Sequence, residues 1–490
     1  MKIFINNFIK KFFKKSIIII FNLLFYFLKI LFSINRAKKK NYYILYEVFL
    51  RDFISRSIIA FRLAQNKNNN VLLISFNKFC EVSDILEPGV VLTKGIMRSK
   101  EFKDILNRHS FYYLNEEQMG FNYKNKLEMR SIPEDFFLTK IKKFFLWGNA
   151  QYQAYKKNKY YKSVFNDKFL ITGCPRYDLI QSQNFLKIFN KEVEDIRKNY
   201  KKYILVVSNF GYAATDKLKD NNADYNINFN FEQICKLFRV PPTDNFRKSY
   251  NKYKVYKIKS AQKYVYMIKM LINKYPDYRI ILRPHASDNI NFWLKYLPTK
   301  NVVFKYSIIP WIIACDVMIH HRCTSAYEAY FLKKKNVISY EPVVNNGYRE
   351  NNYFVMSHLA RNSNQLLNLI NKSLLNKNKL YQKSKKLIYE NIKKLEKKSS
   401  IDKIVKELES SEILKTSNYI LYAYLFSSYI IFKTFGFLHK YTIKYKARFA
   451  KYNHDINVNF FCKSINDSNF FDKKIKVNKI DDETFFLKCN

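Results

Sequence analysis

The stretch that decides the fold is the region that contains RIILRPHASD (279–288), DVMIHHRCTSAYEA (316–329) and VISYEP (337–342). In each segment a short apolar run ends in polar residues, and a helical pattern follows the second run. Short β-rich runs that alternate with helices predict a parallel sheet, and such sheets bind ligands beyond the carboxyl ends of their strands. The polar residues around Arg283, His285 and His320 therefore mark a candidate binding edge.

The same alternation extends over most of the chain and predicts two α/β halves. The predicted strands are 42–47, 71–75, 90–93, 110–114, 143–147 and 169–172 in the first half, and 203–207, 278–282, 316–319 and 337–340 in the second. Apolar spacing predicts helices at 54–65 and 259–274. Residues 221–251 are polar and rich in Asn, which predicts an inserted loop after the first strand of the second half.

The composition is that of a folded protein with a large excess of positive charge. The chain has 490 residues, of which 48% are hydrophobic, and this is enough for two or three domains with cores of their own. The formal net charge of +47 favours an anionic partner: a membrane surface, nucleic acid or a phosphorylated substrate. However, the Lys residues are scattered, and Asn, Ile, Phe and Tyr are also abundant, so biased composition explains the bulk of the charge.

The seven cysteines indicate neither a disulfide framework nor a metal site. They are widely spaced, form no CxxC pair and are odd in number, which is typical of a reducing compartment. His320, His321 and Cys323 lie too close together and lack a second pair of ligands, so we expect no zinc there.

Two apolar, aromatic-rich segments lie outside the α/β pattern. Residues 16–33 have Lys or Arg on both sides, and residues 417–438 are followed by basic residues. Both are near the lower length limit for a bilayer span, and Asn22 and Lys29 interrupt the first. A basic helix lying in the membrane interface fits better than a span, and a buried core helix is the alternative. We expect peripheral or monotopic attachment to an anionic membrane.

A set of short motifs, in this order, resembles one family. The motifs are YEVFLRDFISR (46–56), LWG (146–148), TGCPRYDL (172–179), VSNFGYA (207–213), RPHASD (283–288) and the IPWIIACDVMIHHRCTSAYEA…VISYEP block (309–342). Together they resemble bacterial surface carbohydrate biosynthesis proteins of the GT-B glycosyltransferase type, and more distantly capsular Kdo transferases and CDP-glycerol glycerophosphotransferases. The resemblance implies a nucleotide-activated donor in the second half and a glycan acceptor in the first. The family usually reads RPHP, and Ala286 here replaces the second proline.

Four residues of the second half are candidate donor contacts beyond the strand ends. A departing phosphate needs a proton or a positive hydrogen-bond donor, which His285 beside Arg283 can supply; a structural loop histidine is the alternative. Thr324 and Ser325 open a predicted helix, whose N-terminal N–H groups and hydroxyls favour an anion.

Three further residues of the second half have two interpretations each. Glu328 follows Ser325 by three residues, which makes an S-x-x-E capping box. The resemblance implies instead that Glu328 holds the nucleotide ribose, and this is the role we favour. Asn209 and Gly211 occupy the first strand–helix turn, where glycine allows the backbone to approach a phosphate. A single glycine is not a dinucleotide fingerprint, so a plain turn is equally consistent.

Charged residues also follow the first strand of the first half. Glu47 and Asp52 are candidate general bases for an acceptor hydroxyl, and Arg51 and Arg56 are candidate acceptor contacts. A salt-bridged surface cluster is the alternative. Further along, Arg176 and Asp178 are expected to make structural rather than catalytic contacts between the domains.

The sequence thus predicts an α/β fold of two Rossmann-like domains facing a cleft (GT-B-like), with added C-terminal helices and apolar membrane-associated segments. The predicted units are a membrane-associating segment (1–40), an acceptor domain (41–185), a nucleotide-donor domain (200–362), a helical extension (363–415) and an apolar segment with a basic aromatic tail (416–490).

The predicted function is that of a glycosyltransferase-like enzyme in bacterial surface polysaccharide synthesis, at the cytoplasmic face of the inner membrane. We expect a nucleotide sugar and a glycan or lipid-linked acceptor as substrates, without cofactor, metal or nucleic acid. One alternative is transfer of glycerol- or polyol-phosphate from a CDP donor, and another is a non-catalytic assembly factor. Nucleic-acid binding is a third, indicated by Lys interleaved with aromatics in the tail but by no known motif.

Overall fold

The computed structural model describes the two α/β halves and parts of the chain that pack on them. The described residues are 39–47, 49–94, 107–114, 140–156, 165–211, 243–285, 288, 290–303, 305–344, 356–378, 385, 388–389, 392–393, 399–412, 427, 465, 474–481 and 484–489. The apolar segments 16–33 and 417–438 lie outside these ranges, apart from Ser427. Within the described residues, no helix is both long enough and apolar enough to cross a bilayer.

The first half contains six parallel strands in the spatial order β2-β1-β3-β4-β5-β6. The strands are β1 (Lys40–Tyr46), β2 (Asn69–Ser75), β3 (Val90–Thr93), β4 (Ser110–Leu114), β5 (Ile141–Leu146) and β6 (Phe169–Ile171). Each begins and ends within two residues of the predicted run. The runs are almost continuously apolar because helices cover a parallel sheet on both faces, so side chains on both faces are buried.

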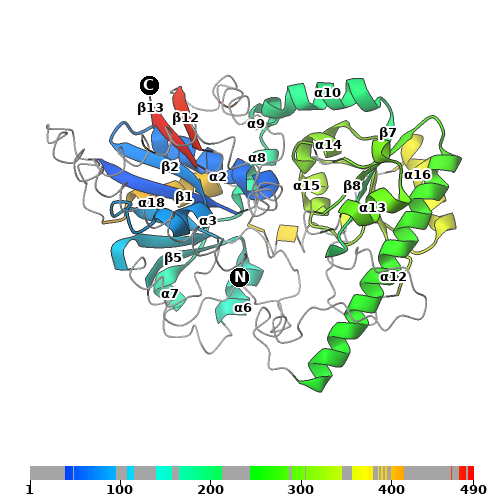
Figure 1. Ribbon diagram of the computed structural model, residues 1–490, viewed down its shortest axis with the longest axis horizontal. Coiled ribbons are helices and arrows are strands. Elements are labelled where there is room, and N and C mark those ends of the chain that lie inside the picture. The colour runs from blue at the N-terminus through cyan, green and yellow to red at the C-terminus, as the bar shows by residue number, and fades with distance from the viewer. Residues whose placement is uncertain are drawn as a thin grey trace, which may run out of the picture.

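The helices of the first half are α2 (Phe49–Ala64), α3 (Phe76–Val82), α6 (Asn149–Lys156), α7 (Phe165–Lys168) and α8 (Pro175–Ile180). A connection of α9 (Gln183–Leu186), a 3-10 turn (Lys187–Phe189) and α10 (Asn190–Tyr200) leads to the second half. Figure 1 shows this connection passing over the top of the molecule from one half to the other.

The second half contains five parallel strands in the order β11-β10-β9-β7-β8. They are β7 (Tyr203–Val207), β8 (Arg279–Arg283), β9 (Val317–His320), β10 (Val337–Tyr340) and β11 (His358–Ala360). Counted within its own half, the first sheet has the order 2-1-3-4-5-6 and the second the order 2-1-3-4-5. Both follow one of the two common doubly wound arrangements and not the 3-2-1-4-5-6 order of dinucleotide-binding Rossmann folds. The predicted α/β fold with two parallel sheets is therefore confirmed.

The helices of the second half are α12 (Asp244–Lys274), α13 (Ile290–Tyr296), α14 (Ile308–Ala314), α15 (Ser325–Phe331) and α16 (Ser363–Leu374), with a 3-10 turn at Thr299–Asn301. The helix predicted at 259–274 begins at Asp244, so residues 244–251 are helical and not part of the predicted loop. No Gly or Pro interrupts the sequence before Pro276, so nothing in this stretch breaks a helix. Residues 221–242 lie outside the described ranges.

The C-terminal part of the chain is divided between the two halves. α16 packs in the second core through Leu366 and Ile370, whereas α18 (Ser400–Glu409) packs against α2 of the first half. A hairpin of β12 (Ile475–Asp481) and β13 (Thr484–Cys489) pairs antiparallel with β2 and extends the first sheet to eight strands. The described helices and strands of the predicted units 363–415 and 416–490 thus pack on the two α/β halves, and the remaining residues of these units lie outside the described ranges.

The two halves meet through helices that follow strand ends. The ring of Tyr177 on α8 lies 5.4 Å from that of Tyr327 and 5.2 Å from that of Phe331, both on α15. Arg176 forms an ion pair with Glu328 in the same contact. Figure 1 shows α8 and α15 facing each other between the two sheets.

Candidate functional site

Each sheet has one position where the strand order reverses. In a 2-1-3-4-5 sheet this switch point lies between strands 1 and 3. The chain that leaves strand 1 and the chain that leaves strand 3 run to opposite sides of the sheet, and the crevice between them is where ligands bind. In this chain the switch points lie between β1 and β3 and between β7 and β9. Glu47 and Lys94 follow the first pair of strands, and Ser208 and Arg322 lie just beyond the second. We take the polar residues at these two edges as the candidate functional site.

Asp288 holds together the two loops that follow β7 and β8. Its carboxylate accepts hydrogen bonds from the Ser208 hydroxyl (2.5 Å), the Gly211 N–H (2.7 Å) and the Trp293 indole N–H (3.2 Å). Its own N–H donates to the His285 carbonyl at 2.9 Å. Gly211 has φ +59°, a left-handed conformation that glycine adopts at little cost. The predicted turn at Gly211 and the predicted loop at His285 therefore form one hydrogen-bonded unit.

His285 is half-buried at the carboxyl end of β8. Its N–H donates to the Ser208 hydroxyl at 3.0 Å, so its backbone is fixed by the same network. The side chain is not part of these backbone bonds. A histidine held by its backbone at a strand end matches the position predicted for it.

Asn209 and Arg322 connect the strands on either side of the second switch point. The Asn209 amide donates to the Arg322 carbonyl at 3.1 Å, and the Lys257 ammonium donates to the Asn209 carbonyl at 2.6 Å. Arg322 has φ +43° and pairs with Glu341 at 2.5 Å. A non-glycine residue in this backbone region costs free energy and is concentrated at functional sites. Two cations, Lys257 and Arg322, thus lie at this edge.

The Arg283 side chain is used within the fold. Its guanidinium donates to the carbonyl of Lys305 at 3.0 Å and to that of Tyr306. Burial lowers the pKa of Arg283 to about 10, partly offset by the nearby carboxylate of Glu192. Burial also raises the pKa of Glu192 to about 7, although Arg283 opposes this shift. Arg283 is buried and supports the strand end from the interior. Its guanidinium is therefore not exposed for the predicted direct contact with the donor.

The buried pair of Glu192 and Arg283 gives a pH-dependent prediction. The carboxyl pKa of Glu192 is about 7 in the folded protein and about 4.5 in the unfolded chain, so binding of its proton stabilises the fold below about pH 4.5. This stabilisation is lost as the pH rises through about 7. We expect the stability of Glu192→Gln relative to the parent to rise by on the order of 3 kcal/mol between pH 4.5 and 7.5. Urea unfolding at several pH values measures this difference. A pH-independent difference would contradict the assigned protonation.

The predicted helix begins at Ser325, but the capping box is not formed. Thr324 is the N-cap, and neither its side chain nor a reciprocal contact from Glu328 caps the helix. Glu328 is fully buried and pairs with Arg176 across the two halves. The capping interpretation is therefore wrong, and a ribose contact would require Glu328 to leave this ion pair. The Ser325 hydroxyl is buried without a hydrogen-bond partner in the described part of the chain.

The predicted link through Arg176 and Asp178 divides into two contacts. Arg176 crosses to Glu328, whereas the Asp178 carboxylate accepts the N–H of Ser400 at 2.6 Å, at the start of α18. Burial raises the pKa of Asp178 to about 6. Both contacts are structural, as expected, but only Arg176 links the two α/β halves.

His320 and His321 are packing residues in this structure. The His320 ring contacts the Ser357 hydroxyl at 2.7 Å and the Cys323 N–H at 3.3 Å, and the His321 ring contacts the Tyr256 hydroxyl at 3.2 Å. Burial lowers the pKa of His320 to about 3 and that of His321 well below its ordinary value. Among the described residues, no three His, Cys, Asp or Glu side chains come together as a metal site.

The charged cluster of the first half is centred on Lys94. Its ammonium lies 2.7 Å from the Asp52 carboxylate and 3.1 Å from that of Glu47. The side chains of Asp52 and Lys94 are 0% and 3% exposed, whereas that of Glu47 is 32% exposed. The cluster is therefore largely buried and not the surface salt bridge of the alternative. Of the two candidate bases, Glu47 is the one that a substrate can reach.

The two arginines predicted to bind the acceptor lie in α2. Arg56 is fully buried, and its guanidinium donates to the Leu114 carbonyl at 2.6 Å, which fastens α2 to the end of β4. In this position it is not accessible to an acceptor. Arg51 lies in the first turn of α2, and its side chain is outside the described residues.

Four residues of the site were not singled out in the sequence. Lys94 and Asp288 carried a usable signal, because a charged residue directly after a predicted strand or motif is the same signal that identified Glu47. Lys257 and Arg322 carried none, since each is one of many basic residues in a chain with 87 Lys and Arg. Their location depends on the packing of α12 on the second sheet and on the pairing of β9 with β7.

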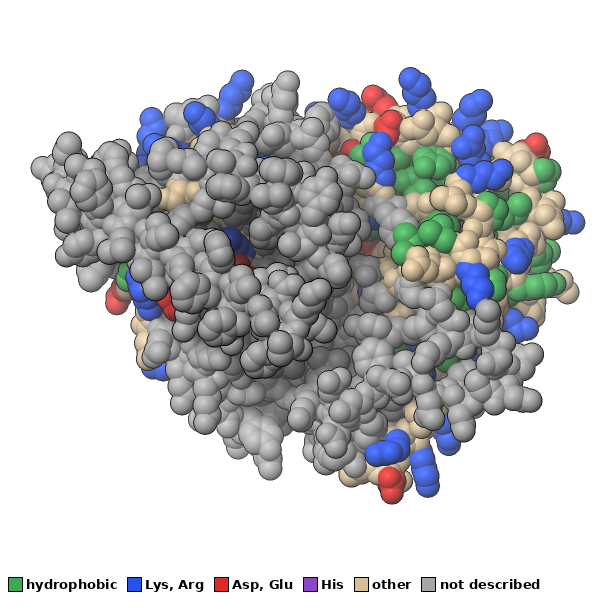
Figure 2. Space-filling view, viewed as in Figure 1, with side chains coloured by type: hydrophobic (Ala, Val, Ile, Leu, Met, Phe, Trp, Pro, Cys, Tyr) green, Lys and Arg blue, Asp and Glu red, His purple; other side chains and the backbone are tan. Residues whose placement is uncertain are grey.

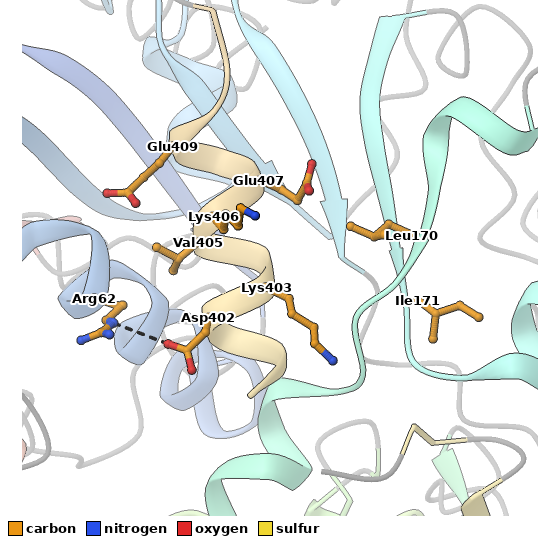
Figure 3. Close-up of a pocket in the computed structure, with 9 residues that line it drawn as sticks. All are labelled: Arg62, Leu170, Ile171, Asp402, Lys403, Val405, Lys406, Glu407 and Glu409. Carbon is orange, nitrogen blue, oxygen red and sulfur yellow. Dashed lines mark ion pairs between the residues drawn. The ribbon is translucent and has the colours of Figure 1, made fainter. Parts of the chain in front are cut away.

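Three cavities in the described part of the chain lie away from these strand-end residues. The cavity in Figure 3, about 580 Å³, lies between α18 and the first half. Its charged residues are balanced, with three cations and three carboxylates, and Arg62 pairs with Asp402 at 3.6 Å. Nothing in this balance favours a charged ligand.

Comparison with known proteins gives no family. No family model matches the chain, and no curated protein matches it. Among solved structures, UDP-GlcNAc 2-epimerase of Methanocaldococcus jannaschii is 13% identical with a TM-score of 0.43, covering 76% of this chain and 100% of that one. The enzyme of the same name from Neisseria meningitidis is 12% identical with a TM-score of 0.42, covering 75% and 98%. The wall teichoic acid polymerase TagF is 11% identical with a TM-score of 0.42, covering 76% and 88%. At these values the similarity does not extend to a reaction or a substrate.

Proposed function

We propose that the chain is a glycosyltransferase-like enzyme that uses a nucleotide-activated sugar in the synthesis of a bacterial surface polysaccharide. The donor would lie at the β7–β9 edge of the second half, and the acceptor at the β1–β3 edge of the first. The observation that carries this proposal is the Asp288 network, which fixes His285 and Gly211 together beside a switch point. We also propose that the two edges face each other across a GT-B-like cleft.

The donor edge has the groups that a phosphate-bearing ligand needs. Lys257 supplies positive charge, Arg322 adds a guanidinium that is paired with Glu341, and the Gly211 turn brings backbone close to the edge. The side chain of His285 can act as a proton or hydrogen-bond donor to the departing phosphate, because charge develops there as the bond to the sugar breaks. No metal is required for these roles.

A thermal-shift screen of nucleotides tests the donor assignment. A nucleotide at 100 times its dissociation constant should stabilise the protein by about 2.7 kcal/mol. A response to UDP or GDP supports a sugar donor, whereas a response to CMP or CDP favours the polyol-phosphate alternative, because transfer of glycerol phosphate from CDP-glycerol releases CMP. If no nucleotide shifts the unfolding temperature at millimolar concentration, the proposed function fails.

The acceptor edge gives a prediction that separates Glu47 from Asp52. Because Glu47 is accessible and Asp52 is buried against Lys94, we expect Glu47→Gln to lower turnover by about 10²–10⁴-fold with nucleotide binding retained. Asp52→Asn should instead destabilise the fold, since it removes one partner of a buried ion pair. Turnover, nucleotide affinity and urea unfolding are measured for both variants. Near-normal turnover of Glu47→Gln would place the base elsewhere.

Attachment to the cytoplasmic face of the inner membrane remains a proposal, because the apolar segments lie outside the described residues. It is supported by the basic flanks of residues 16–33, since each Lys or Arg near an anionic surface adds on the order of 1 kcal/mol. Deleting residues 1–38, which leaves β1 intact, should weaken sedimentation with anionic vesicles, and high salt should release part of the full chain. A chain that does not sediment at low salt would rule out this mode of attachment.

A further inference from the structure

The outer face of α12 carries a row of lysines. The helix has 31 residues, which corresponds to a length of about 46 Å, and contains nine Lys or Arg and a single acid, Asp244. Four exposed lysines, Lys248, Lys252, Lys259 and Lys263, fall within an arc of about 60° around the helix axis, given a rotation of about 100° per residue. We call these four residues the lysine row. They project from a rigid helix on one side.

The opposite face of α12 is fixed to the second half. Ala261, Tyr264 and Ile268 are buried in its core, and Tyr256 and Lys257 reach the candidate donor edge through His321 and Asn209. Figure 1 shows the N-terminal half of the helix projecting beyond the domain. In Figure 2, Lys and Arg side chains project at the lower tip of the molecule, where Figure 1 places the start of α12. The lysine row is therefore held in a fixed orientation relative to the donor edge.

An exposed tyrosine accompanies the lysine row. Tyr266, on the same arc one turn after Lys263, is 64% exposed. An aromatic side chain among cations is typical of surfaces that rest in a membrane interface.

We propose that the lysine row and Tyr266 form a contact surface for an anionic phospholipid bilayer. The cations lie along one line of a straight helix, so all four can meet a plane at once. A tyrosine among them can settle at headgroup depth, where its ring is partly buried and its hydroxyl stays in water. A nucleic acid would meet the same row through its phosphates, and Tyr266 is the one largely exposed aromatic among the described side chains of this helix that a base could stack on. Charge complementarity and the exposed aromatic together favour the bilayer.

This surface determines how the enzyme would face the membrane. Since the inner side of α12 contacts the donor edge, a bilayer under its outer side brings that edge within one helix diameter, about 10 Å, of the lipid. The contact is independent of the terminal apolar segments. It would orient the second half, whereas those segments would only tether the chain.

The first experiment compares two fourfold variants of the full-length chain. In one, Lys248, Lys252, Lys259 and Lys263 become Gln; in the matched control, four exposed lysines on the other face of the second sheet become Gln, namely Lys187, Lys191, Lys198 and Lys202. Lys and Gln have similar helix propensities, and both variants lose the same charge. We expect affinity for vesicles with anionic lipid to fall by roughly fivefold per lysine in the first variant, on the order of 10³-fold in total, and by less than tenfold in the control. Equal losses would overturn the proposal.

The second experiment places a reporter in the contact itself. Tyr266→Trp adds an exposed indole to a chain whose three tryptophans, Trp147, Trp293 and Trp311, are buried. Brominated anionic lipid should quench the new emission on binding, and a bound protein without quenching would contradict the contact. If the lysine-row variant loses affinity for single-stranded RNA but binds vesicles as the parent does, that result also contradicts the membrane contact. The nucleotide-induced thermal shift should be unchanged in these variants, so failure of the membrane contact and failure of the proposed enzymatic function are separately visible.

Discussion

Replacing His285 with Ala is expected to abolish nearly all sugar transfer, with a loss of about 10²–10⁴-fold in turnover. Imidazole is the side chain whose ordinary pKa lies closest to neutral pH, so a histidine at the donor edge suits proton transfer to a departing phosphate. The fold should survive, because the bonds of His285 to Ser208 and Asp288 are made by its backbone N–H and carbonyl, which the substitution keeps. Turnover, unfolding temperature and nucleotide affinity are the measurements.

Two control variants show whether the effect is chemical. His285→Asn keeps a hydrogen-bond donor without a titratable group and should recover part of the binding but little of the turnover. Asp288→Asn weakens the network that holds the loop, and should reduce both nucleotide affinity and stability. Transfer at the parent rate by His285→Ala would remove this residue from the mechanism.

Removing one partner of the ion pair between Arg176 and Glu328 is expected to cost about 3–5 kcal/mol of stability. Glu328 is fully buried, so Glu328→Gln leaves the Arg176 guanidinium without its counter-charge at the contact of the two halves. Arg176→Met should destabilise for the reciprocal reason. Both effects are measured as free energies of unfolding in urea.

The double variant separates the structural role of Glu328 from the ribose role implied by the family resemblance. Replacing Arg176 with Met and Glu328 with Leu removes both charges, so much of the lost stability should return, since a buried apolar pair often matches a buried ion pair. If nucleotide affinity also returns, Glu328 acts through the fold. If the double variant is stable but binds nucleotide weakly, Glu328 contacts the ligand after all.

Sequence patterns were sufficient for the strands and their direction. Runs such as 90–93, 110–114, 203–207 and 337–340 coincide with β3, β4, β7 and β10, because a strand buried on both faces must be continuously apolar. The alternation with helices also fixed the parallel direction and hence the edge at which polar residues gather. The position of His285 beyond a strand and that of Glu47 beyond another follow from this logic.

Partners and accessibility depended on the tertiary structure. The sequence places Glu47, Asp52, Arg283 and Glu328 near strand ends, but it does not tell which of these charges faces solvent. Lys94, 42 residues after Asp52 in the chain, buries that carboxylate and leaves Glu47 exposed. Likewise, Arg176 withdraws Glu328 from solvent into the contact between the halves, which no local pattern around Glu328 indicates.

The sequence by itself determined the local elements and the class of fold, because the spacing of apolar residues within each segment determines which side chains can be buried together. The order of strands, the return of β12 and β13 to the edge of β2 and the pairing of buried charges depend on contacts between distant segments. Such contacts are selected by packing and by the need to neutralise a charge that leaves water, and both are properties of the assembled molecule. For the same reason, the lysine row becomes visible as a surface only when α12 is seen to bury its other face.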